Sequence, residues 1–271
     1  MSESGIFTHT RQSALAKKFV SATAVADYGD SQAIAVAPTG RRSGLLFVLG
    51  NVSLVNRSGG ALACGLAVRF KTTAWAAGQV TAAGAYTADT TDAQDAESGD
   101  FPLHNRADSG SGFLVSADEP FDVLGLVLSA AGDQTTPVKI LEYWNGASWV
   151  DIVASAVINN TLIGDGTGEK VLVWGLPPNW AVGGSGTGVP ATRYNLRCRH
   201  THSGAGSADP AASQLFVGRT VLMVPTLANN AVLSQAQEYG VRCPVSGDAL
   251  FPVFATASAA NEVMIGYRHD N

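Results

Sequence analysis

The pair Asn145-Gly146 constrains the fold of this chain more than any other feature, because it stands between two runs of β-forming residues. Asn-Gly is the strongest short signal for a β-hairpin, since both central residues of a two-residue turn take positive φ. Ile140-Leu141 precedes the pair and Trp149-Val150 follows it. The pattern predicts a tight hairpin with strands at Val138–Trp144 and Ser148–Ala154.

Similar runs recur along the chain at short intervals, separated by Gly, Pro, Asn and Asp. This spacing is typical of antiparallel sandwiches and jelly rolls. The other predicted strands are Ile34–Ala37, Gly44–Asn56, Ala61–Lys71, Phe113–Ser116, Phe121–Ser129, Glu169–Trp174, Thr192–His200, Leu215–Val224, Glu238–Cys243, Phe251–Ala255 and Val263–Arg268. We therefore predict an all-β protein, a β-sandwich or jelly roll with a smaller β-rich part and long irregular loops.

The predicted organisation has an N-terminal arm, a β-rich assembly domain made from both ends of the chain, and a sandwich. These parts are residues 1–12, residues 13–112 with 226–271, and residues 113–225. Asn56-Arg-Ser-Gly-Gly60 predicts a hairpin turn in the assembly domain. Residues 72–112, rich in small and polar side chains, predict an extended loop, laid over a neighbouring subunit or solvated. Ser13–Ala26 is compatible with a short helix or a strand.

Charged residues make up only 14% of the chain and apolar residues 46%, with a net charge of −5. A soluble domain carries about 25% charged residues. The low charge favours a surface covered by neighbouring subunits, although sheet-rich proteins with small residues share this composition. The acidic balance argues against direct binding of nucleic acid, which requires a basic surface.

The three cysteines, Cys64, Cys198 and Cys243, are odd in number and far apart, so we expect buried thiols and no disulfide scaffold. Met1–Thr10 lacks the apolar run of a signal peptide. No segment has the roughly 18 apolar residues of a membrane span. We expect a protein made in the cytoplasm, without a membrane partner.

Two groups of residues are candidate metal ligands, although we expect no metal or other cofactor. His200 and His202 would share one face of a strand, with Glu169 or Asp209 as a guessed third ligand. The alternative places the histidines at a strand end, near solvent or a subunit contact. The acidic residues Asp89, Asp92, Asp95, Glu97 and Asp100 could hold calcium, but their spacing is not that of an EF-hand. A solvated loop, or one paired with arginines of an adjacent copy, is the simpler interpretation.

No convincing catalytic pattern is present, so we expect no enzyme. Gly164–Gly168 and Gly184–Gly188 lack the Gly-Lys-Ser/Thr ending of a phosphate loop, and we interpret both as turns. Glu142 and Asp151 flank the predicted hairpin, where two carboxylates could hydrolyse a glycoside, but acids beside an exposed turn are usually solvated.

Trp75 and Trp180 are the best candidates for aromatic side chains that stack on sugar rings. Trp75 lies in an Ala/Gly-rich segment, and Trp180 follows two prolines. The competing interpretation is that both anchor the core or an interface. We count both tryptophans, together with Asp89, Asp92, Asp95 and Asp100, as candidate interface residues.

Several stretches between Asp89 and about His200, some two-fifths of the chain, resemble a β-sandwich module of structural proteins from tailed bacteriophages. They are Asp89–Asp95, Asp100–Leu103, Gly112–Val115, Asp118–Phe121, Tyr143–Val150 and Pro177–Trp180. These motifs are structural, and the resemblance carries over no active-site residue. It implies a virion component of siphovirus type, either a head decoration (cement) protein or a related head–tail protein.

For the decoration role, the expected partners are the major capsid protein and further copies of the chain, most simply in a homotrimer that matches the local symmetry of a capsid. The alternative is a tail or head fibre module that recognises a host surface glycan. The chain lacks the long repetitive shaft of a fibre, which favours decoration.

Overall fold

The computed structural model of the 271-residue chain describes residues 16–21, 35–36, 45–56, 59–96, 100–133, 138–153, 167–204, 206–235, 239–243, 249–254 and 262–270. Within these residues every paired strand is antiparallel to its neighbour, and the strands form three sheets. The helical elements among them are α1 (Thr90–Gln94) and a 3-10 turn at Thr72–Ala74. The prediction of an all-β chain is therefore confirmed.

The six-stranded sheet follows the order β11-β10-β13-β8-β5-β6. Its strands are β5 (Trp75–Val80), β6 (Tyr86–Ala88), β8 (Gly112–Ala117), β10 (Val138–Trp144), β11 (Trp149–Asp151) and β13 (Tyr194–Thr201). Alternation gives this sheet one core face. On β13, for example, Leu196 and Cys198 are buried in the core, whereas Arg197 and Arg199 between and beyond them are only partly buried.

The seven-stranded sheet follows the order β12-β9-β14-β4-β17-β2, and β7 pairs with β14 beside this path. Its strands are β2 (Ala35–Val36), β4 (Leu62–Arg69), β7 (Phe101–Pro102), β9 (Val123–Ala130), β12 (Gly168–Val173), β14 (Ala211–Leu227) and β17 (Ala249–Phe254). The five-stranded sheet runs β1-β18-β3-β15, with β16 also on β3. Its strands are β1 (Ala16–Ser21), β3 (Leu45–Val55), β15 (Val232–Gln235), β16 (Tyr239–Cys243) and β18 (Glu262–Asp270).

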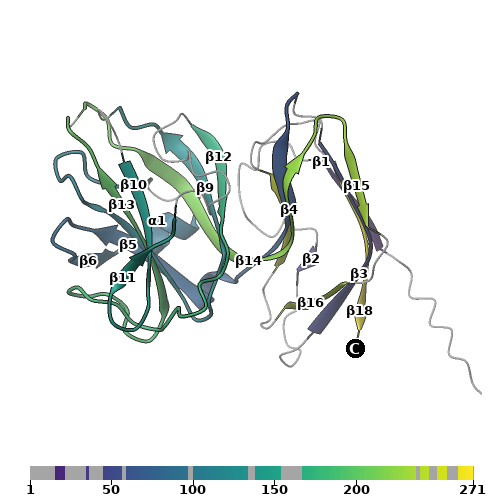
Figure 1. The fold of residues 1–271 in the computed structure, drawn as a ribbon, viewed down its shortest axis with the longest axis horizontal. Helices are drawn as coiled ribbons and strands as arrows, with labels where there is room; N and C mark the ends of the chain where they lie inside the picture. Colours follow the sequence, from purple (N-terminus) through teal and green to yellow (C-terminus); the bar gives the residue numbers. More distant parts are fainter. Residues whose placement is uncertain are drawn as a thin grey trace, which may run out of the picture.

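These sheets make two lobes that lie side by side (Figure 1). One lobe packs the six-stranded sheet against β9, β12 and the first half of β14, and the other contains strands from both ends of the chain. The long strand β14 joins them, because it pairs with β9 through Gly218 and with β4 from Gly218 onward. Strands after residue 226 pair with N-terminal strands, as in β18 with β1 and β3.

The core of the first lobe is built around aromatic side chains from both of its layers. Phe101, Phe113 and Phe121 are fully buried in this core. The Phe121 ring lies 5.9 Å from Trp174 and 5.0 Å from Trp180, measured between ring centroids. Such large side chains supply most of the hydrophobic stabilisation available to a sandwich of this size.

Two predictions about chain organisation are wrong. Residues 72–112 are not one extended loop, because they contain β5, β6, α1 and β7, and β5 pairs with β8 along its whole length. Small residues are needed here because neighbouring segments approach closely: a Cβ on Gly78 would lie 2.7 Å from the Tyr86 ring. The turn at 56–60 does not make a hairpin either, since β3 and β4 belong to different sheets.

Candidate functional site

Three of the five histidines of the chain meet at one end of the six-stranded sheet. His104 belongs to a loop of residues 103–111, which we call the His104 loop, between β7 and β8. Its ring is stacked on that of His200 from β13, with 3.8 Å between centroids and 25° between planes. His202, just beyond β13, lies 5.6 Å from His200 and 6.1 Å from His104.

Backbone hydrogen bonds hold the His104 loop against β13. The amide of Gly110 donates to the carbonyl of His200 (2.8 Å), and the amide of His200 donates to Ser111 (2.9 Å). The Ser109 hydroxyl bonds the backbone of His202 in both directions, at 3.1 Å. The loop therefore extends the ladder between β8 and β13 and brings His104 over the end of β13.

Burial holds the imidazole of His200 in the neutral form. His200 is 2% exposed, and its Nδ1 has no hydrogen-bond partner within the described residues. Both ring nitrogens of His202 are likewise buried and without a hydrogen-bond partner there. Burial lowers the pKa of His200 to about 3, and the neighbouring His104, His202 and Lys139 act in the same direction.

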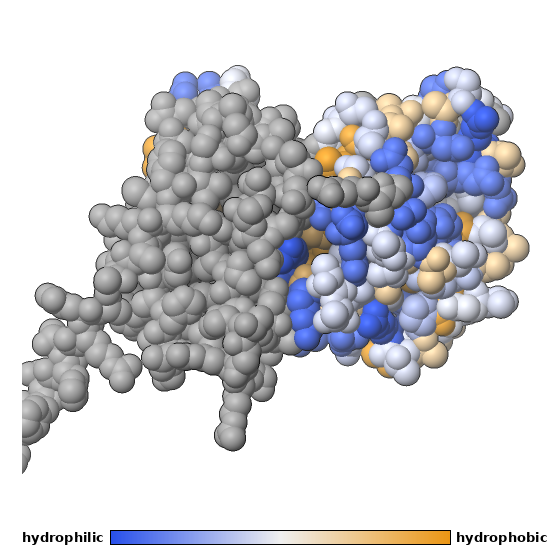
Figure 2. Space-filling view, turned by 180° about the vertical axis from the view of Figure 1, so that it is seen from behind, coloured by the Kyte–Doolittle hydropathy of each residue, from blue (hydrophilic) through white to orange (hydrophobic). Residues whose placement is uncertain are grey.

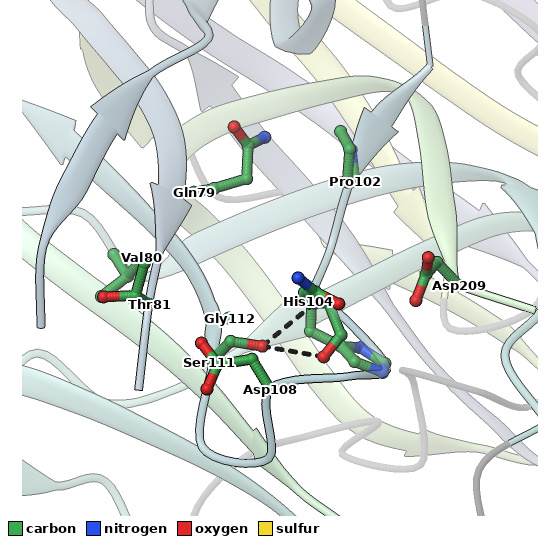
Figure 3. A pocket seen from close by; sticks show the side chains of 10 residues that line it. Gln79, Val80, Thr81, Pro102, His104, Asp108, Ser111, Gly112 and Asp209 are labelled. Carbon is green, nitrogen blue, oxygen red and sulfur yellow. Dashed lines mark hydrogen bonds between the residues drawn. The ribbon is translucent and has the colours of Figure 1, made fainter. Parts of the chain in front are cut away.

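A cavity of about 380 Å³ adjoins this cluster, between the end of β5, the His104 loop and Asp209 (Figure 3). His104 forms part of its wall. Two carboxylates line it, and each already accepts a backbone hydrogen bond: Asp108 from Ala82 (3.0 Å) and Asp209 from Arg106 (2.7 Å). These bonds hold the middle of the His104 loop in place, so the carboxylates have a structural role.

The structure changes the view of the histidine pair given by the sequence. His200 and His202 do lie close together, but their third neighbour is His104, and Glu169 belongs to β12 in the other sheet. In the part of the chain that the structure describes, no group of three or more His, Cys, Asp or Glu residues is arranged to hold a metal ion. Face-to-face stacking of two rings also does not direct their nitrogens to one point. His104 had no sequence signal, because it lies far from the pair along the chain.

The predicted acidic loop is largely ordered secondary structure. Its members are Asp89, Asp92, Asp95, Glu97 and Asp100, of which Glu97 lies outside the described residues. Asp89 precedes α1 and accepts a hydrogen bond from Gln79 (2.9 Å), and Asp92 lies in the first turn, where a negative charge favours the helix dipole. The described acids are spread along the helix and its flanks, so they serve local structure.

The two carboxylates beside the hairpin differ sharply in environment. Glu142 and Asp151 face each other across β10 and β11, as predicted from the hairpin. Asp151 is exposed, whereas Glu142 is buried and bonded by Arg197 (2.8 Å) and Arg199 (2.7 Å). Burial raises the pKa of Glu142, but the hydrogen bonds from both arginines outweigh burial and lower it overall. The expectation of a solvated acid is therefore wrong for Glu142, which is a fixed anion.

The Gly183–Gly188 segment is a series of turns that covers the outer face of the six-stranded sheet. Gly183, Gly186 and Gly188 have φ of 99°, 129° and 80°. Asn195 on β13 holds the segment in place, because its side-chain amide donates to the carbonyls of Gly183 and Pro190, both at 2.8 Å. The interpretation as a turn is confirmed for this segment, whereas residues 164–166 lie outside the described part of the chain.

Trp75 and Trp180 are core residues, only 3% and 8% exposed. Trp180 packs against Phe121, Tyr143 and Tyr194. The core interpretation is therefore the one that the structure supports, and neither ring presents a face to a sugar.

The hairpin and the Pro177–Trp180 stretch form one unit. The Tyr143 hydroxyl hydrogen-bonds the side chain of Asn179 (2.8 Å), and the amide of Ala181 donates to the carbonyl of Trp144 (2.9 Å). The hairpin itself is confirmed, but its loop has four residues, and Asn145 is not among the positive-φ residues of the described chain. The Asn145 side chain instead accepts the amides of Ala147 (2.9 Å) and Ser148 (2.8 Å).

Cys64 and Cys198 are buried free thiols, as predicted. Burial raises the pKa of Cys64 to about 11 and that of Cys198 to about 12, so both stay protonated and unreactive near neutral pH. The side chain of Cys243 lies outside the description.

Comparison with known proteins adds no relative. The chain matches no protein-family model, no curated protein and no solved structure. Among the described residues, none of the helices has the length and apolar character needed to cross a membrane.

Proposed function

We propose that this chain is a structural protein of a tailed-bacteriophage virion, a decoration protein that binds the outer head surface and stabilises contacts between capsomers. Its partners would be the major capsid protein and further copies of itself in a homotrimer. Many copies acting together would give firm attachment even from weak individual contacts.

The observation that carries this proposal is the packing of the stretches on which the phage resemblance rests. The Tyr143–Val150 hairpin contacts Pro177–Trp180 through the Tyr143–Asn179 hydrogen bond and the Tyr143–Trp180 ring pair. Phe121, from another of those stretches, packs on Trp180. These motif residues act as packing residues, which fits a structural module used in assembly better than one built round a reaction.

We further propose that the sandwich lobe is a jelly roll. Apart from the β10–β11 hairpin, consecutive strands from β8 to β14 alternate between the two layers. Such repeated crossing between layers is a property of Greek-key sandwiches and jelly rolls.

The structure does not support the two side chains on which the fibre alternative was based. Glycan recognition was assigned to Trp75 and Trp180, which are both buried. The described lobe also shows a mostly polar surface with scattered apolar spots on the face seen in Figure 2. No described observation favours sugar binding over decoration.

The decisive experiment mixes the purified chain with empty phage capsids that lack it, followed by pelleting and a heat-stability assay of the capsids. Saturable co-sedimentation with raised capsid stability is the expected result. A folded protein that neither pellets with capsids nor stabilises them would refute the decoration role.

A variant set can locate the contact. Deleting residues 1–12 is expected to weaken attachment, as an arm ordered on contact would require. Replacing all of residues 81–100 is unsuitable, because Ala93 in α1 is fully buried. The exposed residues Asp95 and Asp100 should be changed to alanine instead, with a matched control that removes the exposed carboxylates of Asp118 and Asp151. Equal capsid occupancy for all variants would exclude these segments from the contact.

A further inference from the structure

The proposed function does not use the cluster of His104, His200 and His202. The burial of these imidazoles suits the fold at one protonation state and opposes it at another. Imidazoles are tolerated in a buried site when neutral, but an added proton would place an uncompensated charge there. With 3.8 Å between the stacked rings of His104 and His200, two protonated rings would also repel each other strongly. The cluster is therefore stable only while its rings are neutral.

The charged groups that act on His200 do not offset such a charge. Lys139 on β10 is opposite His200 in the register of the sheet and disfavours a second positive charge. Arg199, also on β13, is bonded to Glu142. On the loop side, Asp108 and Asp209 border the cavity next to His104, where each already accepts a backbone amide.

The hydrogen-bond pattern indicates that protonation of the cluster would act on the His104 loop. The His104 loop is tied to β13 by few hydrogen bonds, and those bonds involve Gly110, Ser109 and Ser111 against His200 and His202 themselves. The ladder of β9 with β14, in contrast, is far longer and runs from Ala211 to Gly218. Charging the cluster would therefore act first on the loop and leave the opposite layer paired.

We propose that the three histidines form an acid-released latch, which holds the His104 loop on β13 at neutral pH and frees it when the buried His200 takes up a proton. Release of the loop opens the wall of the adjoining cavity, to which His104 contributes. The latch is independent of the proposed function, because it concerns the local stability of the fold.

The direction of the pH dependence follows from linkage. A histidine whose pKa is lowered in the closed state binds its proton more readily in the open state, so the closed state is fully favoured above about pH 6.5 and weakens as the pH falls. One histidine with an ordinary pKa in the open state makes opening about thirtyfold more frequent at pH 5.0 than at pH 7.5.

Amide hydrogen exchange of the full chain at pH 7.5 and pH 5.0, corrected for the intrinsic exchange rate, tests the latch. The amides of Gly110, His200 and His202 are expected to lose about thirtyfold or more of their protection at pH 5.0. Amides in the β9–β14 ladder are the internal control and should keep theirs. Equal protection of the loop at both pH values, or a loss of the same size in the control ladder, would overturn the proposal.

Two variants separate titration from packing. His200→Phe keeps a ring for stacking but cannot take up a proton, so the pH dependence of loop exchange should shrink. Lys139→Gln removes the positive charge opposite His200, so the pKa of His200 in the closed state rises toward its open-state value and the release should move to lower pH. Should His200→Phe not fold, an NMR titration of the wild-type imidazoles decides instead: a pKa of His200 below 6.5 supports the latch, and an ordinary or raised pKa contradicts it.

Discussion

At the scale of single residues, environment decides chemistry more than residue type does. Glu142 and Asp151 face each other on paired strands, yet one is a buried anion clasped by two arginines and the other is exposed. Arg197 also makes a cation–π contact, because its guanidinium carbon lies 4.4 Å from the centroid of the Trp149 ring. A paired, ionised Glu142 cannot donate a proton near neutral pH, and this removes the only carboxylate pair that the sequence offered for hydrolysis.

Replacing Glu142 with glutamine should cost about 3 kcal/mol of unfolding free energy, since it leaves two partly buried arginines without their anion. Urea denaturation at pH 7 measures the loss. Because the folded pKa of Glu142 is lowered, its contribution is present above its unfolded pKa and is lost as the pH falls through the folded one. Asp151→Asn, the exposed partner, is the control and should change stability by less than about 0.5 kcal/mol. Equal losses in the two variants would contradict this account.

At the scale of elements, close packing between neighbouring strands of one sheet explains where the sequence is small. Gly125 on β9 faces the ring of Phe216 on β14, and a Cβ at this position would overlap that ring. Glycine is unfavourable inside a strand, so its presence here reflects space rather than backbone conformation. The same reasoning applies to Gly78 on β5 beneath Tyr86.

Gly125→Ala is expected to destabilise the protein by roughly 1–3 kcal/mol, because the fully packed neighbours must move to admit one methyl group. The matched control is Gly175→Ala, since a Cβ at Gly175 would meet nothing within 4 Å. Thermal or chemical unfolding of both variants measures the difference. A Gly125→Ala protein as stable as the control would show that the contact between Gly125 and Phe216 is looser than described.

At the scale of the whole molecule, the two lobes depend on one strand and its ends. Gly218 pairs with Val123 of β9 on one side and with Arg69 of β4 on the other, so β14 belongs to both lobes. At its far end, the fully buried Asn56 donates to the carbonyls of Leu227 (2.7 Å) and Gly60 (2.8 Å). Asn56, which the sequence placed in a hairpin turn, thus stabilises the connection between the sheets of β3 and β4.

Asn56→Ala should lower stability by about 2 kcal/mol, because two carbonyls lose a buried donor. Asn229→Ala is a control from the same region: its side chain accepts the exposed amide of Gly59 (3.1 Å), so the loss should be small. Chemical denaturation compares the two. A larger loss of stability in Asn229→Ala than in Asn56→Ala would rule out the Asn56 hydrogen bonds as the stabilising contact.

The sequence by itself determined the all-β class, the positions of strands such as β10 and β13, the hairpin between β10 and β11, and the turns of Gly183–Gly188. These features are local, because side-chain alternation and turn residues act over a few neighbours. Of the site, the sequence offered the pair His200 and His202 and, as a guessed third ligand, Asp209, which lines the adjoining cavity.

The tertiary structure alone decided which strands share a sheet, why β5 is a strand despite its small residues, and that His104 meets the pair on β13. Pairing between segments far apart in the chain depends on loop closure and on how side chains fit between layers. Neither of these leaves a pattern in the neighbouring residues, and this is the physical reason that the cluster and its loop became visible only in the folded molecule.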